Sequence, residues 1–207
     1  MQYLNKRANI FAVLIGAIFL CFFLFYNRYP VVYVDTGAYI LKAFVDKFTQ
    51  DRPMFYGWFI QHISLKESLY LVSFAQGLIV SSLTLLYFKY FMNKRYYASY
   101  FLVFITIISF LTGASFHVSR LMPDAFTAVF LLSMILLLYV RKLSWIEIVY
   151  VSILYVFSLV SHNSHMMINS LLIITIIVYL TVQLIRRKNF VFPVKRMILV
   201  GVLTGSA

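Results

Sequence analysis

Long apolar segments alternate with short polar ones along most of the chain. A run of roughly 20 apolar residues is enough to cross the hydrocarbon core of a bilayer as a helix. The pattern predicts six such helices, near residues 9–26, 69–91, 98–115, 123–140, 146–161 and 166–185. A seventh apolar segment begins near Met197. At Ala207 it has reached about half of the length needed to cross a bilayer, so we expect the chain to be truncated at its C-terminus. The predicted fold is an all-α, polytopic transmembrane helical bundle, with residues 1–207 forming a single domain.

The longest polar interruption, residues 27–69, separates the first two predicted spans. Within it, residues 36–48 place apolar side chains at nearly helical spacings, with Lys42, Asp46 and Lys47 between them. This pattern predicts a short amphipathic helix lying on the membrane surface. The aromatic residues between 55 and 59 suit a second interfacial element, although an ordinary belt of interfacial aromatics explains them equally well.

Composition agrees with a membrane protein and excludes a water-soluble globule. Hydrophobic residues make up 63% of the chain and charged residues 12%, whereas soluble domains have about half and about a quarter. The net charge of +12 is dispersed at the ends of apolar segments, so we expect no nucleic acid partner. The single cysteine, Cys21, allows no intrachain disulfide. Lys6 and Arg7 open a long apolar run without a small-residue cleavage site, which predicts a retained anchor.

Basic residues predict the orientation of the bundle. Under the positive-inside rule, segment ends rich in lysine and arginine are cytoplasmic. This predicts a multi-pass protein of the plasma (inner) membrane with a cytoplasmic N-terminus. Four of the six acids fall in residues 27–69, and all four histidines fall on the outer side, so any chemistry is expected to face outward. Twelve of the eighteen basic residues lie at every second boundary between apolar segments: Lys6, Arg7, Lys89, Lys94, Arg95, Arg141, Lys142, Arg186, Arg187, Lys188, Lys195 and Arg196.

Two outer aspartates are candidate catalytic residues. Asp35 near the lipid boundary is partly desolvated, which raises its basicity and suits a general base; the alternative is a helix N-cap. Asp124 follows Pro123 and fits the first turn of a helix, but with His117 and Arg120 it also suits a phosphate site. Asp35 and Asp124 would also serve as oxygen ligands for a divalent metal, Mg²⁺ or Mn²⁺, although no spacing signature supports one.

A third polar cluster lies between the last two full spans. His162, His165 and Asn169 are three and four positions apart, so they share a face if they are helical. Polar groups at membrane depth usually face a cavity or the bundle interior. The alternatives are a hydrated turn between helices and a His/His zinc pair, which lacks a third ligand. The candidate substrate pocket comprises Tyr39, Tyr56, His162, Asn163 and His165.

The layout resembles the GT-C superfamily of membrane glycosyltransferases, which use polyprenyl-phosphate-linked sugars. The resemblance is carried by Asp35 in Val-Asp-Thr-Gly-Ala-Tyr, by Asp124 in Arg-Leu-Met-Pro-Asp-Ala-Phe, by the long first outer loop and by its amphipathic helix. It implies that Asp35 is the catalytic base or orients the acceptor, and that Asp124 supports it or binds metal. A single Asp35 stands where many relatives have a pair of acids, which weakens the expectation of a metal.

These observations together predict sugar transfer from a polyprenyl-phosphate donor at the outer face. The chain has no glycine-rich nucleotide loop, so the transferred group is expected to arrive on a membrane lipid. Arg52, Arg120 and His117 are the candidate donor phosphate-binding residues, because charge developing on the leaving phosphate needs nearby cations. The alternatives are a polytopic transporter or lipid flippase, and a non-catalytic subunit of an envelope polysaccharide system. Ionisable groups gathered at one face rather than at the midplane favour the enzyme.

Overall fold

The predicted all-α class is confirmed. The computed structural model describes residues 2–45, 52–93, 95–186 and 194–205. Over these residues the chain is helical and contains no strand. One isolated bridge joins Val31, in the polar segment 27–69, to Arg120, which follows α7.

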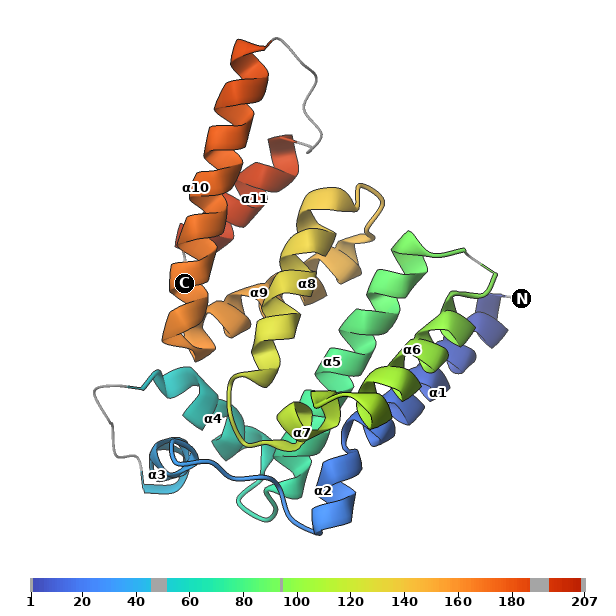
Figure 1. The fold of residues 1–207 in the computed structure, drawn as a ribbon, viewed down its shortest axis with the longest axis vertical. Helices are drawn as coiled ribbons and strands as arrows, with labels where there is room; N and C mark the ends of the chain where they lie inside the picture. The colour runs from blue at the N-terminus through green and yellow to red at the C-terminus, as the bar shows by residue number, and fades with distance from the viewer. Residues whose placement is uncertain (1, 46–51, 94, 187–193, 206–207) are drawn as a thin grey trace.

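Eleven helices occur in the described part of the chain (Figure 1). The helices are α1 (Gln2–Leu20), α2 (Phe22–Asn27), α3 (Thr36–Val45), α4 (Met54–Ile63), α5 (Tyr70–Phe91), α6 (Tyr97–Leu111), α7 (Ala114–Ser119), α8 (Ala125–Tyr139), α9 (Trp145–Ser161), α10 (Asn163–Ile185) and α11 (Val194–Gly205). Long apolar helices alternate with short ones; the short helices α3 and α4 were predicted, whereas α2 lies within a segment predicted to be a full span and α7 begins within another.

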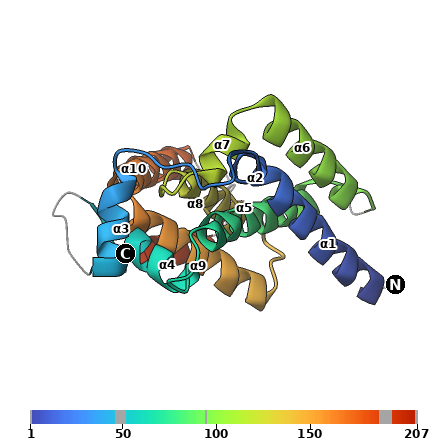
Figure 2. The ribbon, with the colours of Figure 1, turned by 90° about the horizontal axis from the view of Figure 1, so that it is seen from below.

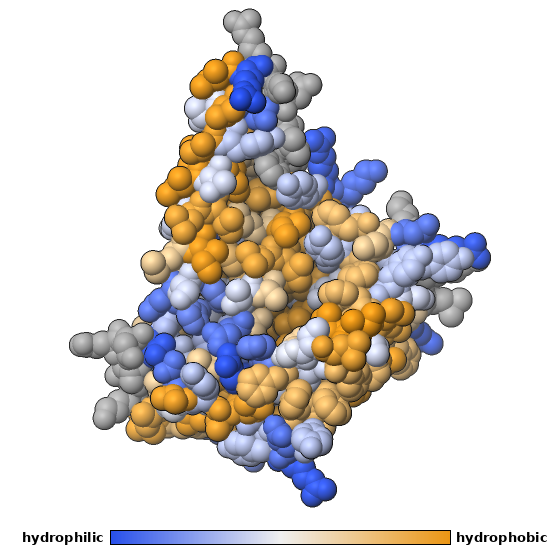
Figure 3. Space-filling model, viewed as in Figure 1, coloured by the Kyte–Doolittle hydropathy of each residue, from blue (hydrophilic) through white to orange (hydrophobic). Residues whose placement is uncertain are grey.

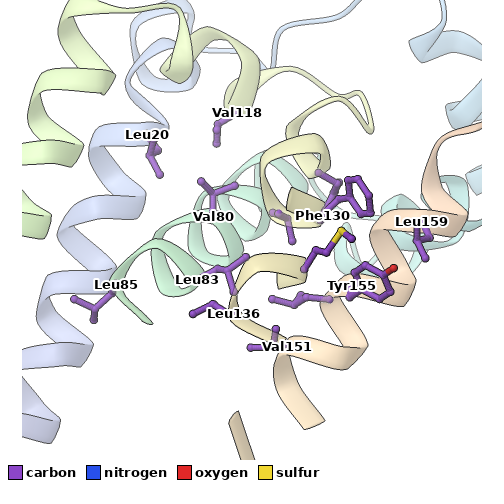
Figure 4. Packing of buried hydrophobic residues seen from close by; sticks show 14 of the residues in the cluster. Leu20, Val80, Leu83, Leu85, Val118, Phe130, Leu136, Val151, Tyr155 and Leu159 are labelled. Carbon is purple, nitrogen blue, oxygen red and sulfur yellow. The ribbon is translucent and has the colours of Figure 1, made fainter. Parts of the chain in front are cut away.

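Helix α5 lies at the centre of the bundle and contacts α1 and α6 on one side and α8 on the other. Figure 4 shows the packing of this core, in which Leu83 of α5 lies near Leu136 of α8 and Val151 of α9, all three fully buried. The short helices α2, α3, α4 and α7 gather at one end of the bundle, and α2 and α7 lie side by side in both views (Figures 1 and 2). This end therefore carries the segments 27–69 and 112–124 and the junction between α9 and α10.

Six full membrane spans are not confirmed. Of the described helices, α5 and α10 are long and apolar enough to cross a membrane. Helices α6, α8 and α9 have 15 to 17 residues, about 22–26 Å at a rise of about 1.5 Å per residue, which is shorter than a hydrocarbon core of about 30 Å. In α10, 6% of the most apolar window is buried, compared with 50% in α5. Apart from the face that packs on α9, helix α10 thus exposes apolar side chains over most of its surface, a distribution typical of a helix in lipid.

The first predicted span, 9–26, is two helices that meet at Cys21. The break is stabilised by α7, because Ser115 Oγ accepts a hydrogen bond from the Phe23 N–H at 3.1 Å and Ser119 Oγ accepts one from the Leu24 N–H at 3.1 Å. Side-chain hydroxyls thereby satisfy amide groups that lie at the start of α2. The pattern of apolar residues contains no sign of this break.

The third predicted span, 98–115, is also interrupted, since α6 ends at Leu111 and α7 begins at Ala114. The extended backbone of Thr112 separates them, and its hydroxyl accepts a hydrogen bond from the Ala114 N–H at 3.2 Å. Helix α8 begins at Ala125, so Asp124 is not in its first turn but precedes it. These boundaries leave residues 112–124, which include α7, as the connection between α6 and α8.

The two short helices predicted in the first outer loop are present as α3 and α4. Helix α3 exposes Leu41 and Phe44 and buries Lys42, contrary to the polar face expected for a lysine. The α3–α4 contact explains this, because a Cβ on Gly57 would lie 2.7 Å from the Lys42 Cγ, so only glycine leaves room for the lysine stem. The Lys42 ammonium lies 5.6 Å from the centroid of the Trp58 ring. Asp46 and Lys47 lie outside the described residues.

Replacing Gly77 by alanine is expected to destabilise the bundle. A Cβ at this position of α5 would lie 2.6 Å from Cys21 Sγ and 3.2 Å from the Ala17 carbonyl oxygen, so α1 and α5 must separate. Overpacking of this kind costs about 1–3 kcal/mol. Gly201→Ala in α11 is the matched control, since a Cβ there meets nothing within 4 Å. Thermal unfolding in detergent should show a lower midpoint for Gly77→Ala alone; equal midpoints for the two variants would contradict this packing.

Candidate functional site

The polar segment 27–69 and the segment 112–124 are joined by backbone hydrogen bonds, and this loop-to-loop contact holds the candidate site. The Val31 N–H donates to the Ser119 carbonyl at 3.0 Å, and the Leu121 N–H donates to the Val31 carbonyl at 2.9 Å. The buried Thr36 hydroxyl donates to the Leu121 carbonyl at 3.1 Å. Asp35 precedes Thr36, and Asp124 follows Leu121 by three residues. The two candidate acids therefore flank one loop-to-loop contact.

Gln76 of α5 stabilises this loop-to-loop contact through side-chain hydrogen bonds. Its Nε2 donates to the Val118 carbonyl at 2.8 Å and to the Arg120 carbonyl at 2.9 Å, and its Oε1 accepts from the Tyr56 hydroxyl at 2.5 Å. Burial raises the pKa of Tyr56 well above its usual value, and the nearby Tyr39 and Asp124 act in the same direction. Tyr56 is therefore a neutral hydrogen-bond donor at all physiological pH values.

The two tyrosines predicted to line a substrate pocket belong instead to the hydrophobic core. Tyr39 and Tyr56 are almost completely buried, and their rings meet edge to face with centroids 5.0 Å apart. Such a pair stabilises the packing of α3 on α4. Their contribution to the site is to support it rather than to touch a ligand at its surface.

Asp35 and Arg52 form the more accessible charged pair of the site. Arg52 Nη2 lies 2.8 Å from Asp35 Oδ1, and the side chains are 31% and 28% exposed. An ion pair this exposed contributes about 1 kcal/mol or less to stability, because water and salt screen it. An incoming anion can therefore displace Asp35 from Arg52 at little cost.

Asp124 has two side-chain partners, Arg120 and His162, which come from different loops. It pairs with Arg120, and its Oδ1 lies 3.5 Å from His162 Nε2. The Ser164 N–H donates to His162 Nδ1 at 3.1 Å, so a neutral His162 carries its proton on Nε2 and presents it to Asp124. The Arg120 guanidinium lies 5.3 Å from the centroid of the Tyr33 ring, which fixes its plane. Arg120 is more enclosed than Arg52, because 12% of its side chain is exposed.

The histidine cluster divides into one residue at the site and one in the core. Helix α10 begins at Asn163, so His162 is its N-cap while Asn163 is exposed. His165 is 1% exposed and contacts Thr127 Oγ1 through Nε2 at 2.8 Å and the Ser158 carbonyl through Nδ1 at 2.6 Å. His165 is thus a hydrogen-bonded residue that joins α10 to α8 and α9.

An apolar cavity of about 420 Å³ opens beside Asp124 and His117. It lies between α6 and α8, with α5 as its floor and α1 and α7 at its sides. Asp35, Arg52 and His162 lie outside it. The apolar lining of the cavity includes Leu20, Val80, Phe88, Phe104, Ile108, Ala128 and Leu132. On the surface of the molecule, hydrophilic residues gather where α3, α4 and the start of α10 meet, next to largely hydrophobic surface (Figure 3).

The arrangement of donors does not fit a metal shared by Asp35 and Asp124. Each carboxylate already has an arginine partner, Arg52 for Asp35 and Arg120 for Asp124. Within the described ranges, no three histidine, cysteine, aspartate or glutamate residues come together as a metal site. Positive charge at both carboxylates opposes the approach of a divalent cation, so we assign the local charge balance to the arginines.

No family model, curated protein or solved structure matches the chain. The site therefore has to be interpreted from its own geometry. Sequence reasoning did not select Gln76 or Thr36, although both hold the site together. For Gln76 a signal was present, since a glutamine inside a long apolar helix usually has a buried partner.

Proposed function

We propose that this chain is a membrane glycosyltransferase of the GT-C type, which transfers a sugar from a polyprenyl-phosphate donor to an acceptor at the outer face of the plasma (inner) membrane. The observation that carries the proposal is the apolar cavity of about 420 Å³ whose lining includes Asp124 and His117. A lipid phosphate needs such a combination, because its chain requires an apolar space and its head requires polar and cationic groups. Arg120, paired with Asp124, supplies positive charge beside that lining.

We extend the two candidate spans to a multi-pass bundle of six, with the start of a seventh in α11. Two observations support this extension. Helix α10 exposes much apolar surface, and the shorter helices α1, α6 and α8 pack against α5, which is long enough to span a membrane. Helices shorter than the hydrocarbon core are accommodated by local thinning of the bilayer at a small cost per ångström. In this placement α3 lies at the outer membrane surface, with Leu41 and Phe44 toward lipid.

Transfer proceeds as a displacement at the anomeric carbon of the donor. The acceptor oxygen forms the new bond to that carbon, the bond from the carbon to the phosphate oxygen breaks, and the lipid phosphate leaves with the electron pair. Asp35 takes the proton of the acceptor hydroxyl. The donor phosphate draws Arg52 away from Asp35, so donor binding itself frees the base. Arg52, Arg120 and His117 stabilise the charge on the leaving phosphate.

The deeper polar residues of the bundle favour an enzyme over a carrier. Asn169 Oδ1 accepts from the Tyr155 hydroxyl at 2.7 Å, and its Nδ2 donates to Thr204 Oγ1 at 3.2 Å. These groups are engaged with one another and join α9, α10 and α11. A substrate path across the membrane would need polar groups facing an open channel instead.

Filling the cavity is expected to weaken use of the lipid donor. Ala128 is exposed and lines the cavity on α8, so Ala128→Trp places an indole where the lipid chain is proposed to bind. Transfer from a radiolabelled polyprenyl-phosphate sugar should then show a KM for the donor raised about tenfold, equivalent to about 1.4 kcal/mol, with kcat less affected. Ile174→Trp, on the exposed surface of α10, should leave the KM unchanged. Equal effects of the two variants would contradict the cavity as the donor site.

Cysteine labelling tests which side of the membrane the site faces. Glu67→Cys and Lys142→Cys introduce thiols at exposed positions at opposite ends of the bundle. A membrane-impermeant maleimide applied to intact cells should label the first variant and not the second, because the acid-rich loop is proposed to be outside. The unsubstituted chain, whose Cys21 is buried, gives the background. Labelling of residue 142 without residue 67 would overturn the orientation.

A further inference from the structure

A second apolar cavity, of about 820 Å³, lies on the opposite side of the bundle from the first, along α9 and α11. It extends from Trp145 and Arg196, at the starts of the two helices, to Val160 of α9 and Phe55 of α4. The segment of α9 that lines it is about 22 Å long at about 1.5 Å per residue. The cavity is thus a groove that follows most of the length of the bundle.

The groove is apolar except at two places. Among the described residues that line it, Arg196 is the one with a charge, and it lies at the end where α9 and α11 begin. The second place is Ser152, about two helical turns along α9 from Trp145. Its hydroxyl oxygen is buried and has no hydrogen-bond partner within the described part of the chain. A buried hydroxyl without a partner is costly, so a ligand that accepts its hydrogen bond is stabilised there.

The order of these groups matches one class of lipid. A diacyl phospholipid has a phosphate at one end, ester carbonyls about one or two helical turns further along, and two apolar chains beyond them. Arg196 matches the phosphate, Ser152 matches an ester carbonyl, and the surface from Ile153 to Val160 matches the chains. A polyisoprenyl phosphate has no ester and leaves Ser152 without a partner.

We propose that this groove is a binding site for an anionic diacyl phospholipid of the cytoplasmic leaflet, with its phosphate on Arg196 and an ester carbonyl on Ser152. The site is distinct from the cavity beside Asp124. The inference rests on the membrane location and orientation given under the proposed function, and it does not depend on glycosyl transfer.

Native mass spectrometry of the full chain in detergent tests the site. The protein is mixed with equal amounts of phosphatidylglycerol and phosphatidylcholine that carry the same acyl chains. The wild-type chain should retain phosphatidylglycerol about tenfold more than phosphatidylcholine, equivalent to about 1.4 kcal/mol. Arg196→Gln should bring this ratio to about 1. Arg141→Gln, an exposed basic residue near the same end of the bundle but outside the groove, should leave the ratio unchanged.

Two further variants separate the role of the groove from that of surface charge. Ser152→Ala should lower retention of both diacyl lipids alike, about threefold, because it removes a hydrogen bond common to them. Ile153→Trp fills the groove at an exposed position and should lower retention of both lipids even if Arg196→Gln proves unstable. A wild-type ratio near 1, an equal loss in Arg141→Gln, or stronger retention of a polyisoprenyl phosphate that Ser152→Ala leaves unchanged would each overturn the proposal. A chain that retains the lipid preference but transfers no sugar would contradict the proposed function alone.

Discussion

Asp35→Asn is expected to reduce sugar transfer about 10²–10⁴-fold, the loss typical of removing a general base. The amide has nearly the size of the carboxylate but cannot take a proton from the acceptor hydroxyl. Donor binding should be retained, since His117 and Asp124, which line the cavity, are unchanged. The measurement is kcat for transfer from a radiolabelled polyprenyl-phosphate sugar, together with the KM for the donor.

The control for this variant is Glu67→Gln, which neutralises another acid of the first outer loop at an exposed position. Its transfer rate should equal that of the wild-type chain. Unfolding midpoints of Asp35→Asn and wild type should agree closely, because the half-buried Asp35–Arg52 pair still contacts water and contributes about 1 kcal/mol or less. Full transfer activity in a folded Asp35→Asn variant would remove Asp35 from the mechanism.

The largest expected loss of stability follows from Gln76→Leu. This substitution removes the hydrogen-bond partner of the buried Tyr56 hydroxyl and of the Val118 carbonyl, and one of the two partners of the Arg120 carbonyl. The Arg120 carbonyl still accepts a hydrogen bond from the Met122 N–H at 2.9 Å. Each of the other two buried groups costs about 1–3 kcal/mol when unpaired, so the total is about 2 kcal/mol or more. Tyr56→Phe removes a hydroxyl from the same network and should cost less. Thermal unfolding midpoints in detergent, measured for both variants against wild type, test this order.

Gln61→Leu is the matched control, because Gln61 lies on the neighbouring helix α4 and is half-buried. Its midpoint should stay close to that of the wild-type chain. Gln76→Leu should also lower transfer even under conditions where it is folded, since the Arg120 carbonyl that Gln76 holds is part of the loop that carries Asp124. Equal midpoints for Gln76→Leu and Gln61→Leu would show that the network does not support the site.

The sequence allowed the helical class and most element positions to be predicted, because hydrophobic periodicity is a local property. What it missed depends on partners far along the chain. The break at Cys21 is stabilised by serines of α7 more than 90 positions away. The burial of Lys42 depends on Gly57 of a different helix. No local sequence pattern predicts such contacts.

The candidate site was predictable in composition but not in arrangement. His117, Arg120 and Asp124 were grouped because they are close in the sequence, but the ion pair of Arg120 with Asp124 forms across a non-helical segment, where helical spacing does not apply. The approach of His162 to Asp124 requires knowledge that α10 begins beside α8. His165 was placed in the pocket because it shares a face with Asn169, yet that face packs against α8, α9 and α11. Periodicity identifies a polar face and does not say whether water or protein covers it.

The proposed glycosyl transfer is tested most directly by following the sugar itself. Purified full-length protein in liposomes receives a polyprenyl-phosphate donor with a radiolabelled sugar, together with extracts of candidate acceptors, and the label is followed in the lipid and acceptor fractions. Glycosyl transfer with Asp35 as the base predicts that label moves to the acceptor with wild-type protein and stays on the lipid with Asp35→Asn. Label that crosses the bilayer while still attached to lipid, at the same rate in both proteins and without reaching any acceptor, would contradict glycosyl transfer and identify a lipid carrier.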